Sequence, residues 1–176
     1  MLLKEYVQNV RDSILDGTVD ADYVRAIALL KEAKKVIVIG NGGSAAIASH
    51  MQNDLCKACG IRAMVLTETS LLTALSNDMN YNEAYPELVE LWADMGDTLV
   101  AISSSGKSEN IIRCCRIAKK IGCSVITLSG FTLNNHLRKE GDVNFYIPSM
   151  DYGVVELSHS IITHYLTDMI NAENHG

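Results

Sequence analysis

Two short segments rich in glycine and serine have the composition of phosphate-binding loops. Gly40-Asn41-Gly42-Gly43-Ser44 follows the apolar residues 36–39, and Ser103-Ser104-Ser105-Gly106-Lys107-Ser108 follows the mostly apolar residues 98–102. Glycines let the backbone approach an anion closely. Hydroxyls and free N–H groups at the positive end of a helix bind phosphate well. Two such loops in one short chain predict a small phosphorylated ligand between two strand ends.

Each loop also has a purely structural explanation. Ser108 is expected at the N-cap or in the first turn of a helix, so Ser103 and Ser108 could simply cap backbone groups. The glycines at 40–43 could serve only a tight turn from strand to helix. The occurrence of both loops in one chain favours the phosphate ligand.

Residues 101–108, Ala-Ile-Ser-Ser-Ser-Gly-Lys-Ser, also come close to the P-loop pattern of nucleotide hydrolases. Lys107 would then contact the β- and γ-phosphates, and Ser108 would hold magnesium. Three features argue against this alternative. Ala101 replaces the first glycine of the pattern, the strand expected at 124–129 ends without a metal-supporting aspartate, and a second phosphate-type loop is present.

The elements that must position these loops alternate between strand and helix. Hydrophobic patterning predicts strands at 35–40, 62–67, 98–103, 123–128 and 143–148, and helices at 43–58, 69–77, 82–94, 108–121, 132–139 and 153–171. This alternation predicts an α/β protein, a doubly wound three-layer αβα sandwich with a five-stranded parallel sheet. Ligands of such sheets bind at the carboxyl ends of strands, near the reversal of strand order. Both loops belong to that edge.

A pair of helices is predicted before the sheet begins. Apolar residues recur at helical spacing over 2–15, and a second helix is expected from about 20 to 34. A helical pair outside the sheet often makes a subunit contact. We therefore expect a single domain in which residues 1–34 form an oligomer contact and residues 35–176 form the α/β core.

Composition restricts the class of protein. The chain has 176 residues, a formal net charge of -6, 48% hydrophobic residues and 6% aromatic residues. The acidic balance disfavours nucleic acid as the main partner. No apolar stretch approaches the ~20 residues that span a bilayer, and the amino-terminal residues do not resemble a secretory signal. We expect a cytoplasmic protein without nucleic-acid or membrane partners.

Cysteine usage agrees with that compartment. The five cysteines are Cys56, Cys59, Cys114, Cys115 and Cys123. An odd number without a secretory signal predicts reduced thiols. Cys56 and Cys59 form a single CxxC, and Cys114-Cys115 has the wrong spacing to complete a structural zinc site.

These motifs resemble those of the sugar isomerase (SIS) domain family, especially its phosphoheptose isomerase branch. The resemblance extends over nearly the whole chain, through residues 40–44, His50, Leu55, 76–78, 96–97, 102–108, 125–130, His159 and His164. It implies the SIS fold, a homotetramer with active sites between subunits, and aldose–ketose isomerisation of a sugar phosphate. The expected reaction converts sedoheptulose 7-phosphate into D-glycero-D-manno-heptose 7-phosphate for lipopolysaccharide or other surface polysaccharides.

The resemblance also implies roles for individual residues. Phosphate-contacting positions correspond to Ser44, Ser103, Ser105 and Ser108, and sugar-lining positions to Asn41, Ser104 and Asp78. We add Gly42, Gly43 and Glu156 to this predicted substrate-binding set. Asp54 stands where the branch usually has Glu, Glu156 where it has Gln, and Gly153 where it has Asp. Some relatives are non-catalytic, so a regulatory module that binds a sugar phosphate or a protein is the alternative.

Isomerisation through an enediol needs a base beside two adjacent carbons and an acid–base group for their oxygens. Histidine and carboxylate side chains suit this task near neutral pH. His50 and Asp54 are four residues apart and share a helix face. Glu156 and His164 are eight apart, offset by roughly 80° around a helix, and can face one cleft. Our hypothesis makes Asp54 the carbon base and His164 its acid–base partner.

The same four residues, His50, Asp54, Glu156 and His164, form a plausible zinc-binding set of two imidazoles and two carboxylates. The acid–base chemistry requires no metal, so zinc is an option and not a necessity. Where no metal binds, His50 and Glu156 are expected to orient the substrate or the catalytic pair. His159 is expected to be a packing or interface histidine, and His175 to lie in a frayed tail.

Overall fold

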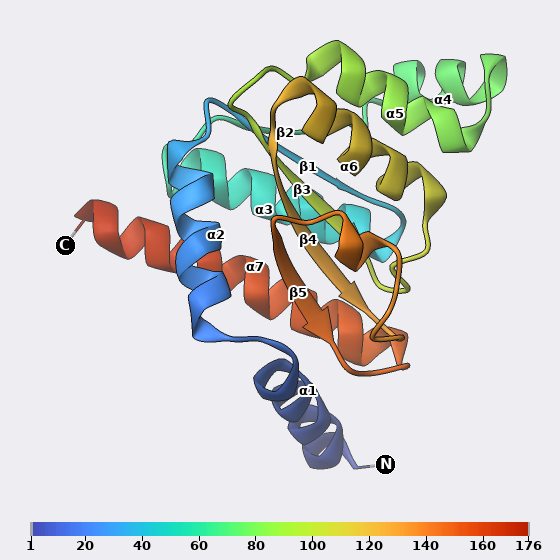
Figure 1. Ribbon diagram of the computed structural model, residues 1–176. Coiled ribbons are helices and arrows are strands. Elements are labelled where there is room, and N and C mark those ends of the chain that lie inside the picture. The colour runs from blue at the N-terminus through green and yellow to red at the C-terminus, as the bar shows by residue number, and fades with distance from the viewer. Residues whose placement is uncertain (1, 176) are drawn as a thin grey trace.

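Largely apolar segments form the strands of this protein, as expected of a sheet that helices cover on both faces. In the computed structural model, which describes residues 2–175, five parallel strands are ordered β2-β1-β3-β4-β5. They are β1 (Val36–Gly40), β2 (Ala63–Val65), β3 (Thr98–Ser103), β4 (Ser124–Gly130) and β5 (Val143–Ile147). Every residue of β1 and β3 is buried. The predicted three-layer α/β architecture is confirmed (Figure 1).

The helices divide between the two faces of the sheet. One face packs against α2 (Asp20–Glu32), α3 (Gly43–Lys57) and α7 (Tyr152–His175), with α1 (Leu3–Gly17) at the side of α7 and β5. The other packs against α5 (Tyr81–Trp92) and α6 (Glu109–Ile121), with α4 (Thr69–Asp78) on the outer side of α5.

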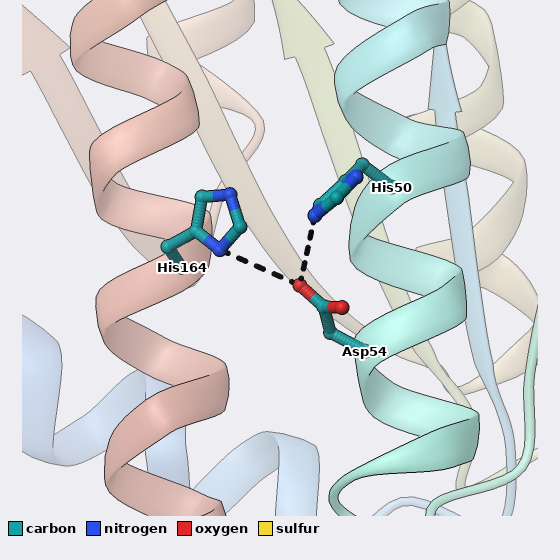
Figure 2. A group of neighbouring side chains, drawn as sticks. All are labelled: His50, Asp54 and His164. Atoms are coloured by element: carbon teal, nitrogen blue, oxygen red, sulfur yellow. Dashed lines mark ion pairs between the residues drawn. The ribbon is translucent and has the colours of Figure 1, made fainter.

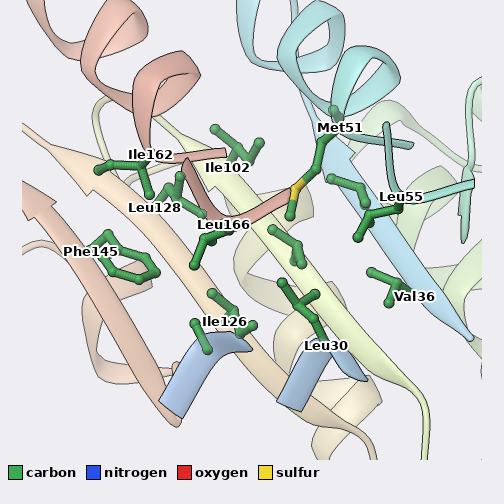
Figure 3. Packing of buried hydrophobic residues seen from close by; sticks show 14 of the residues in the cluster. Leu30, Val36, Met51, Leu55, Ile102, Ile126, Leu128, Phe145, Ile162 and Leu166 are labelled. Carbon is green, nitrogen blue, oxygen red and sulfur yellow. The ribbon is translucent and has the colours of Figure 1, made fainter. Parts of the chain in front are cut away.

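Alternation along each strand builds two separate hydrophobic cores. Val36 and Val38 of β1 point to one core, and Ile37 and Ile39 point to the other. In the first core, residues of α2, α3 and α7 interdigitate above the strands (Figure 3). This packing holds α3 and α7 side by side, and both helices carry predicted site residues.

The helix predicted over 132–139 is wrong. Only a short 3-10 helix forms there, at Leu137–Lys139. The Asn135 side chain donates to the carbonyls of Gly130 and Thr132 and accepts from the backbone N–H of Arg138. Such side-chain bonds compete with helical ones, so the segment folds as a compact turn.

The amino-terminal helical pair forms as predicted. A Cβ on Gly17, the last residue of α1, would lie 1.9 Å from the carbonyl oxygen of Tyr146, so glycine permits the close approach of α1 to β5. At the other end of the chain, α7 continues to His175, beyond the predicted limit of 171. The His175 side chain lies outside the described residues. Within residues 2–175, no helix is long and apolar enough to cross a membrane.

Candidate active site

The strand order reverses between β1 and β3, and the two predicted loops meet there. β1 and β3 are neighbours with Gly40 opposite Ile102, while the chain leaves β1 toward β2 and leaves β3 toward β4. This topology opens a crevice at the carboxyl edge of a parallel sheet, where ligands of such folds bind.

A cavity of about 160 Å³ lies at this point. It is lined by Asn41, Ser44, Ile102, Ser103, Ser104, Ser105, Ser108, Tyr152 and Glu156. Seven of these nine were predicted from the sequence, and Ile102 and Tyr152 are the additions. Four serines of one loop and one of the other converge on a small polar space, which is the size and chemistry that a phosphate group requires.

The serine hydroxyls in the cavity are not used as helix caps. Ser108 is the N-cap residue of α6, but its side chain makes no capping bond; its Oγ lies 2.9 Å from the Oγ of Ser103. The Oγ of Ser104 is buried and has no hydrogen-bond partner among the described residues. A buried hydroxyl without a partner costs free energy, which a ligand can recover by bonding to it.

Gly106 shapes the serine-rich loop. Its φ angle is +62°, and an added Cβ would lie 2.2 Å from the Oδ1 atom of Asn135. The left-handed backbone and the close approach both exclude larger residues. Asn135 is itself fixed by its bonds to Ser129 and the following turn, so it supports the loop from behind.

The glycine-rich loop brings a carboxylate into the same cavity. Gly42 has a φ angle of +55° at the N-cap of α3, and Gly43 begins that helix. A Cβ on Gly43 would lie 2.6 Å from Oε2 of Glu156, which comes from α7. The Glu156 carboxylate therefore lies against the positive end of α3 and forms one wall of the cavity.

The Asn41 side chain is held by two residues that sequence reasoning missed. Asn41 and Asn110 exchange two amide hydrogen bonds of 3.0 Å, and the Tyr81 hydroxyl donates to the Asn41 Oδ1 atom at 2.7 Å. Asn110 lies in the first turn of α6 and is 2% exposed. Its only signal in the sequence is a polar residue on the buried face of an amphipathic helix. Tyr81 is far away in sequence and gives no signal.

The predicted acid–base residues form a second group, on the facing sides of α3 and α7 (Figure 2). The Asp54 Oδ2 atom lies 3.3 Å from Nε2 of His50 and 3.5 Å from Nδ1 of His164. The two imidazole rings contact edge to face with centroids 4.7 Å apart. About half of each histidine side chain is exposed, whereas that of Asp54 is 22% exposed. The carboxylate is thus shared by two imidazoles that solvent or a ligand can reach.

The cavity and the histidine group lie along the same pair of helices. Glu156 meets Gly43 at the amino-terminal ends of α7 and α3, and His164 meets Asp54 further along both. Eight residues of α7 separate Glu156 from His164, a rise of about 12 Å. Glu156 therefore lines the cavity and is not part of the group that could hold a metal, which among the described residues comprises His50, Asp54 and His164.

Several other predicted residues lie elsewhere. Asp78 is exposed at the end of α4 and does not line the cavity. Lys107 is exposed and also does not line it, so the resemblance to a P-loop gains no support from the geometry. His159 is fully buried with Nε2 3.2 Å from the Ser129 carbonyl oxygen, as expected of a packing residue. Burial lowers the pKa of His159 to about 4, against the opposing effect of that hydrogen bond. The five cysteines form no disulfide.

Comparisons with known proteins identify related sequences and structures. A model of the SIS domain family matches residues 6–130. Phosphoheptose isomerase from Aliarcobacter butzleri is 34% identical over 154 residues, covering 84% of this chain and 81% of the relative. The enzyme of the same name from Sulfurimonas denitrificans is 36% identical over 156 residues, covering 85% and 80%. The solved structure of phosphoheptose isomerase from Neisseria gonorrhoeae superposes with a TM-score of 0.86 at 27% identity, covering 95% and 94%.

Proposed function

The chain belongs to the SIS domain family, and from this premise we propose that it is a phosphosugar isomerase. The observation that supports catalysis best is the grouping of Asp54 with His50 and His164 on the same two helices that border the serine cavity. A binding module needs only the cavity. An isomerase needs in addition a base and an acid–base partner beyond it, and these residues provide both.

The proposed substrate is sedoheptulose 7-phosphate, converted into D-glycero-D-manno-heptose 7-phosphate. Its phosphate would bind the hydroxyls of Ser44, Ser103, Ser105 and Ser108, with Ser104 and Asn41 facing the adjoining carbons. Glu156, which lines the serine cavity, and His164 are separated by about 12 Å along α7, a span that suits a long ketose chain. The relatives are named phosphoheptose isomerase, which supports a seven-carbon sugar phosphate as the substrate class.

The proposed mechanism uses the carboxylate and one imidazole. Asp54 removes a proton from C1 of the open-chain ketose, and His164 moves a proton between the two oxygens as the enediol forms. Asp54 then returns a proton to C2. His50 orients the carboxylate from the opposite side at 3.3 Å. Glu156 accepts hydrogen bonds from sugar hydroxyls at the wall of the cavity.

The reaction as proposed does not depend on a metal, but three residues fit a zinc ion. His50, Asp54 and His164 offer two imidazole nitrogens and a carboxylate oxygen, all within 4.8 Å of one another. These are donors that zinc accepts, and three protein ligands leave a position for substrate. A bound zinc ion would supply Lewis-acid polarisation of the substrate oxygens. Elemental analysis of protein purified without an affinity tag tests this option.

We also propose a cytoplasmic homotetramer acting in surface-polysaccharide synthesis. Support for assembly comes from large apolar side chains exposed on the amino-terminal helices and on α7, namely Leu3, Val7, Leu15, Val24, Ile161 and Tyr165. Aspartate or lysine in place of Leu3 and Val7 should weaken assembly, and light scattering after size-exclusion chromatography measures the mass. A wild-type mass equal to that of one chain would contradict the tetramer.

A thermal-shift screen followed by turnover assays tests the function. Pentose, hexose and heptose phosphates are screened first, together with ATP and magnesium, and each sugar phosphate that stabilises the protein is assayed for isomerisation. We expect stabilisation and turnover with sedoheptulose 7-phosphate. Stabilisation without turnover of any hit would favour the non-catalytic module. Stabilisation only by ATP with magnesium would favour the nucleotide hydrolase.

A further inference from the structure

We infer that Asn110 is a positioning residue for the sugar end of the substrate and acts through Asn41; this inference rests on the proposed function. Asn110 is buried beneath the cavity and does not line it, whereas Asn41 does. The Nδ2 atom of each amide donates to the Oδ1 atom of the other at 3.0 Å. The reciprocal pair fixes the plane of the Asn41 amide, because rotating it would break both bonds.

The Tyr81 hydroxyl completes this arrangement. It donates to Oδ1 of Asn41 over 2.7 Å, a typical O–H···O distance. The carbonyl oxygen of Asn41 then accepts two hydrogen bonds, one for each lone pair. One of the two N–H groups of Asn41 donates to Asn110, and within residues 2–175 the other has no acceptor, so it can donate to a ligand in the cavity that Asn41 lines. Asn41 is thereby set to act as a donor, which selects an oxygen acceptor on the ligand, such as the carbonyl or a hydroxyl of a ketose.

The amide pair also fixes the distance between the two loops. Asn41 follows β1, and Asn110 follows the serine-rich loop after β3, so their two bonds join the loops across the reversal of strand order. The donor for the sugar is thus held at a fixed position relative to the serines for the phosphate. Binding of an isolated phosphate ion does not depend on this spacing between the loops. Binding of a sugar phosphate that contacts both loops does depend on it.

Two substitutions remove the two supports separately. Asn110→Leu keeps the branched shape of the side chain, removes its hydrogen-bonding groups and adds no charge near the phosphate, and Tyr81→Phe removes only a hydroxyl from a residue that is 49% exposed. The measurements are kcat and KM for sedoheptulose 7-phosphate and the inhibition constant of inorganic phosphate. Asn171→Leu, near the far end of α7, is the matched control.

We expect Asn110→Leu to lower kcat/KM about tenfold or more, the equivalent of about one hydrogen bond in a buried site. Tyr81→Phe should lower it by a smaller factor. The inhibition constant of phosphate should be unchanged in both variants, and Asn171→Leu should match wild type throughout. A lower kcat/KM with an unchanged inhibition constant of phosphate distinguishes a role in positioning the sugar from general damage to the loops.

Three results would contradict the inference. Wild-type kcat/KM in both variants would show that Asn41 needs no support, while the proposed function would stand. An equal loss of phosphate affinity would show a general structural role. If Asn110→Leu does not fold, unchanged kinetics of Tyr81→Phe decide against the inference. If the wild-type protein turns over no phosphosugar, the proposed function itself is wrong, and this is known before any variant is compared.

Discussion

The Asp54 carboxylate of α3 lies 3.5 Å from the Nδ1 atom of His164 on α7. The two residues are 110 positions apart in sequence and meet because α3 and α7 pack side by side on one face of the sheet. Their contact unites the proposed carbon base with its acid–base partner.

Asp54→Asn and His164→Asn should each lower kcat by about 10²- to 10⁴-fold, the usual contribution of a positioned acid or base. Binding of inorganic phosphate should persist, because the serines are untouched. Steady-state kinetics and phosphate inhibition measure the two effects. Asp168→Asn, one turn beyond His164 on α7, is the matched control and should keep wild-type rates. Wild-type rates in both test variants would remove the pair from the mechanism.

Ser104→Ala should weaken substrate binding without destabilising the free protein. Among residues 2–175 the buried Ser104 hydroxyl has no partner, so its loss removes a desolvated group and breaks no hydrogen bond there. We expect an unchanged or higher Tm without ligand and about tenfold weaker binding of the sugar phosphate. A lower Tm without ligand, with unchanged affinity, would instead assign the hydroxyl to the fold.

Gly106→Ala should destabilise the protein by more than the backbone strain alone would cost, because the added Cβ also clashes with Asn135. Gly106 and Gly60 both have φ angles in the left-handed region, +62° and +68°, but only the added Cβ at position 106 would meet Asn135. Gly60→Ala should therefore cost about 1 kcal/mol, and Gly106→Ala should cost more and lose phosphate affinity. Urea unfolding and phosphate titration measure both. Equal losses in the free energy of unfolding for the two variants would show that the Asn135 side chain moves aside without affecting stability.

Acid should destabilise the protein through His159. Its pKa falls from 6.5 to about 4 on folding, so the unfolded chain binds the proton more readily. The contribution of neutral His159 to the free energy of unfolding is complete above about pH 6.5. It is lost progressively down to about pH 4, and the total loss is about 3 kcal/mol. Urea unfolding at pH 7.5 and pH 5 should show a smaller loss in His159→Gln than in wild type. His136→Gln, an exposed matched control, should keep the wild-type pH dependence.

Much of the fold and the phosphate cavity could be predicted from the sequence, because both depend on local signals. Apolar runs followed by glycine and serine mark strand ends, and a parallel sheet brings those ends to one edge. Local signals gave a wrong prediction over 132–139, where the expected helix does not form because hydrogen bonds of the Asn135 side chain replace helical ones.

Contacts between distant segments could not be predicted in this way. Glu156 and His164 were expected to face one cleft because of their angular offset, but their separation along α7 places Glu156 in the cavity and His164 beside Asp54. Tyr81 reaches Asn41 only because α5 begins beside β1, and no periodicity encodes that approach.

Isomerisation of sedoheptulose 7-phosphate in D2O, followed by proton NMR, tests the central claim most directly. The base removes a proton from C1, exchanges it with solvent and returns deuterium to C2. We predict that wild type forms the aldose with deuterium at C2 and that Asp54→Asn forms almost none. An aldose without deuterium would contradict a base that exchanges its proton with solvent before returning it to C2, and the absence of any aldose would contradict the assignment as an isomerase of this substrate.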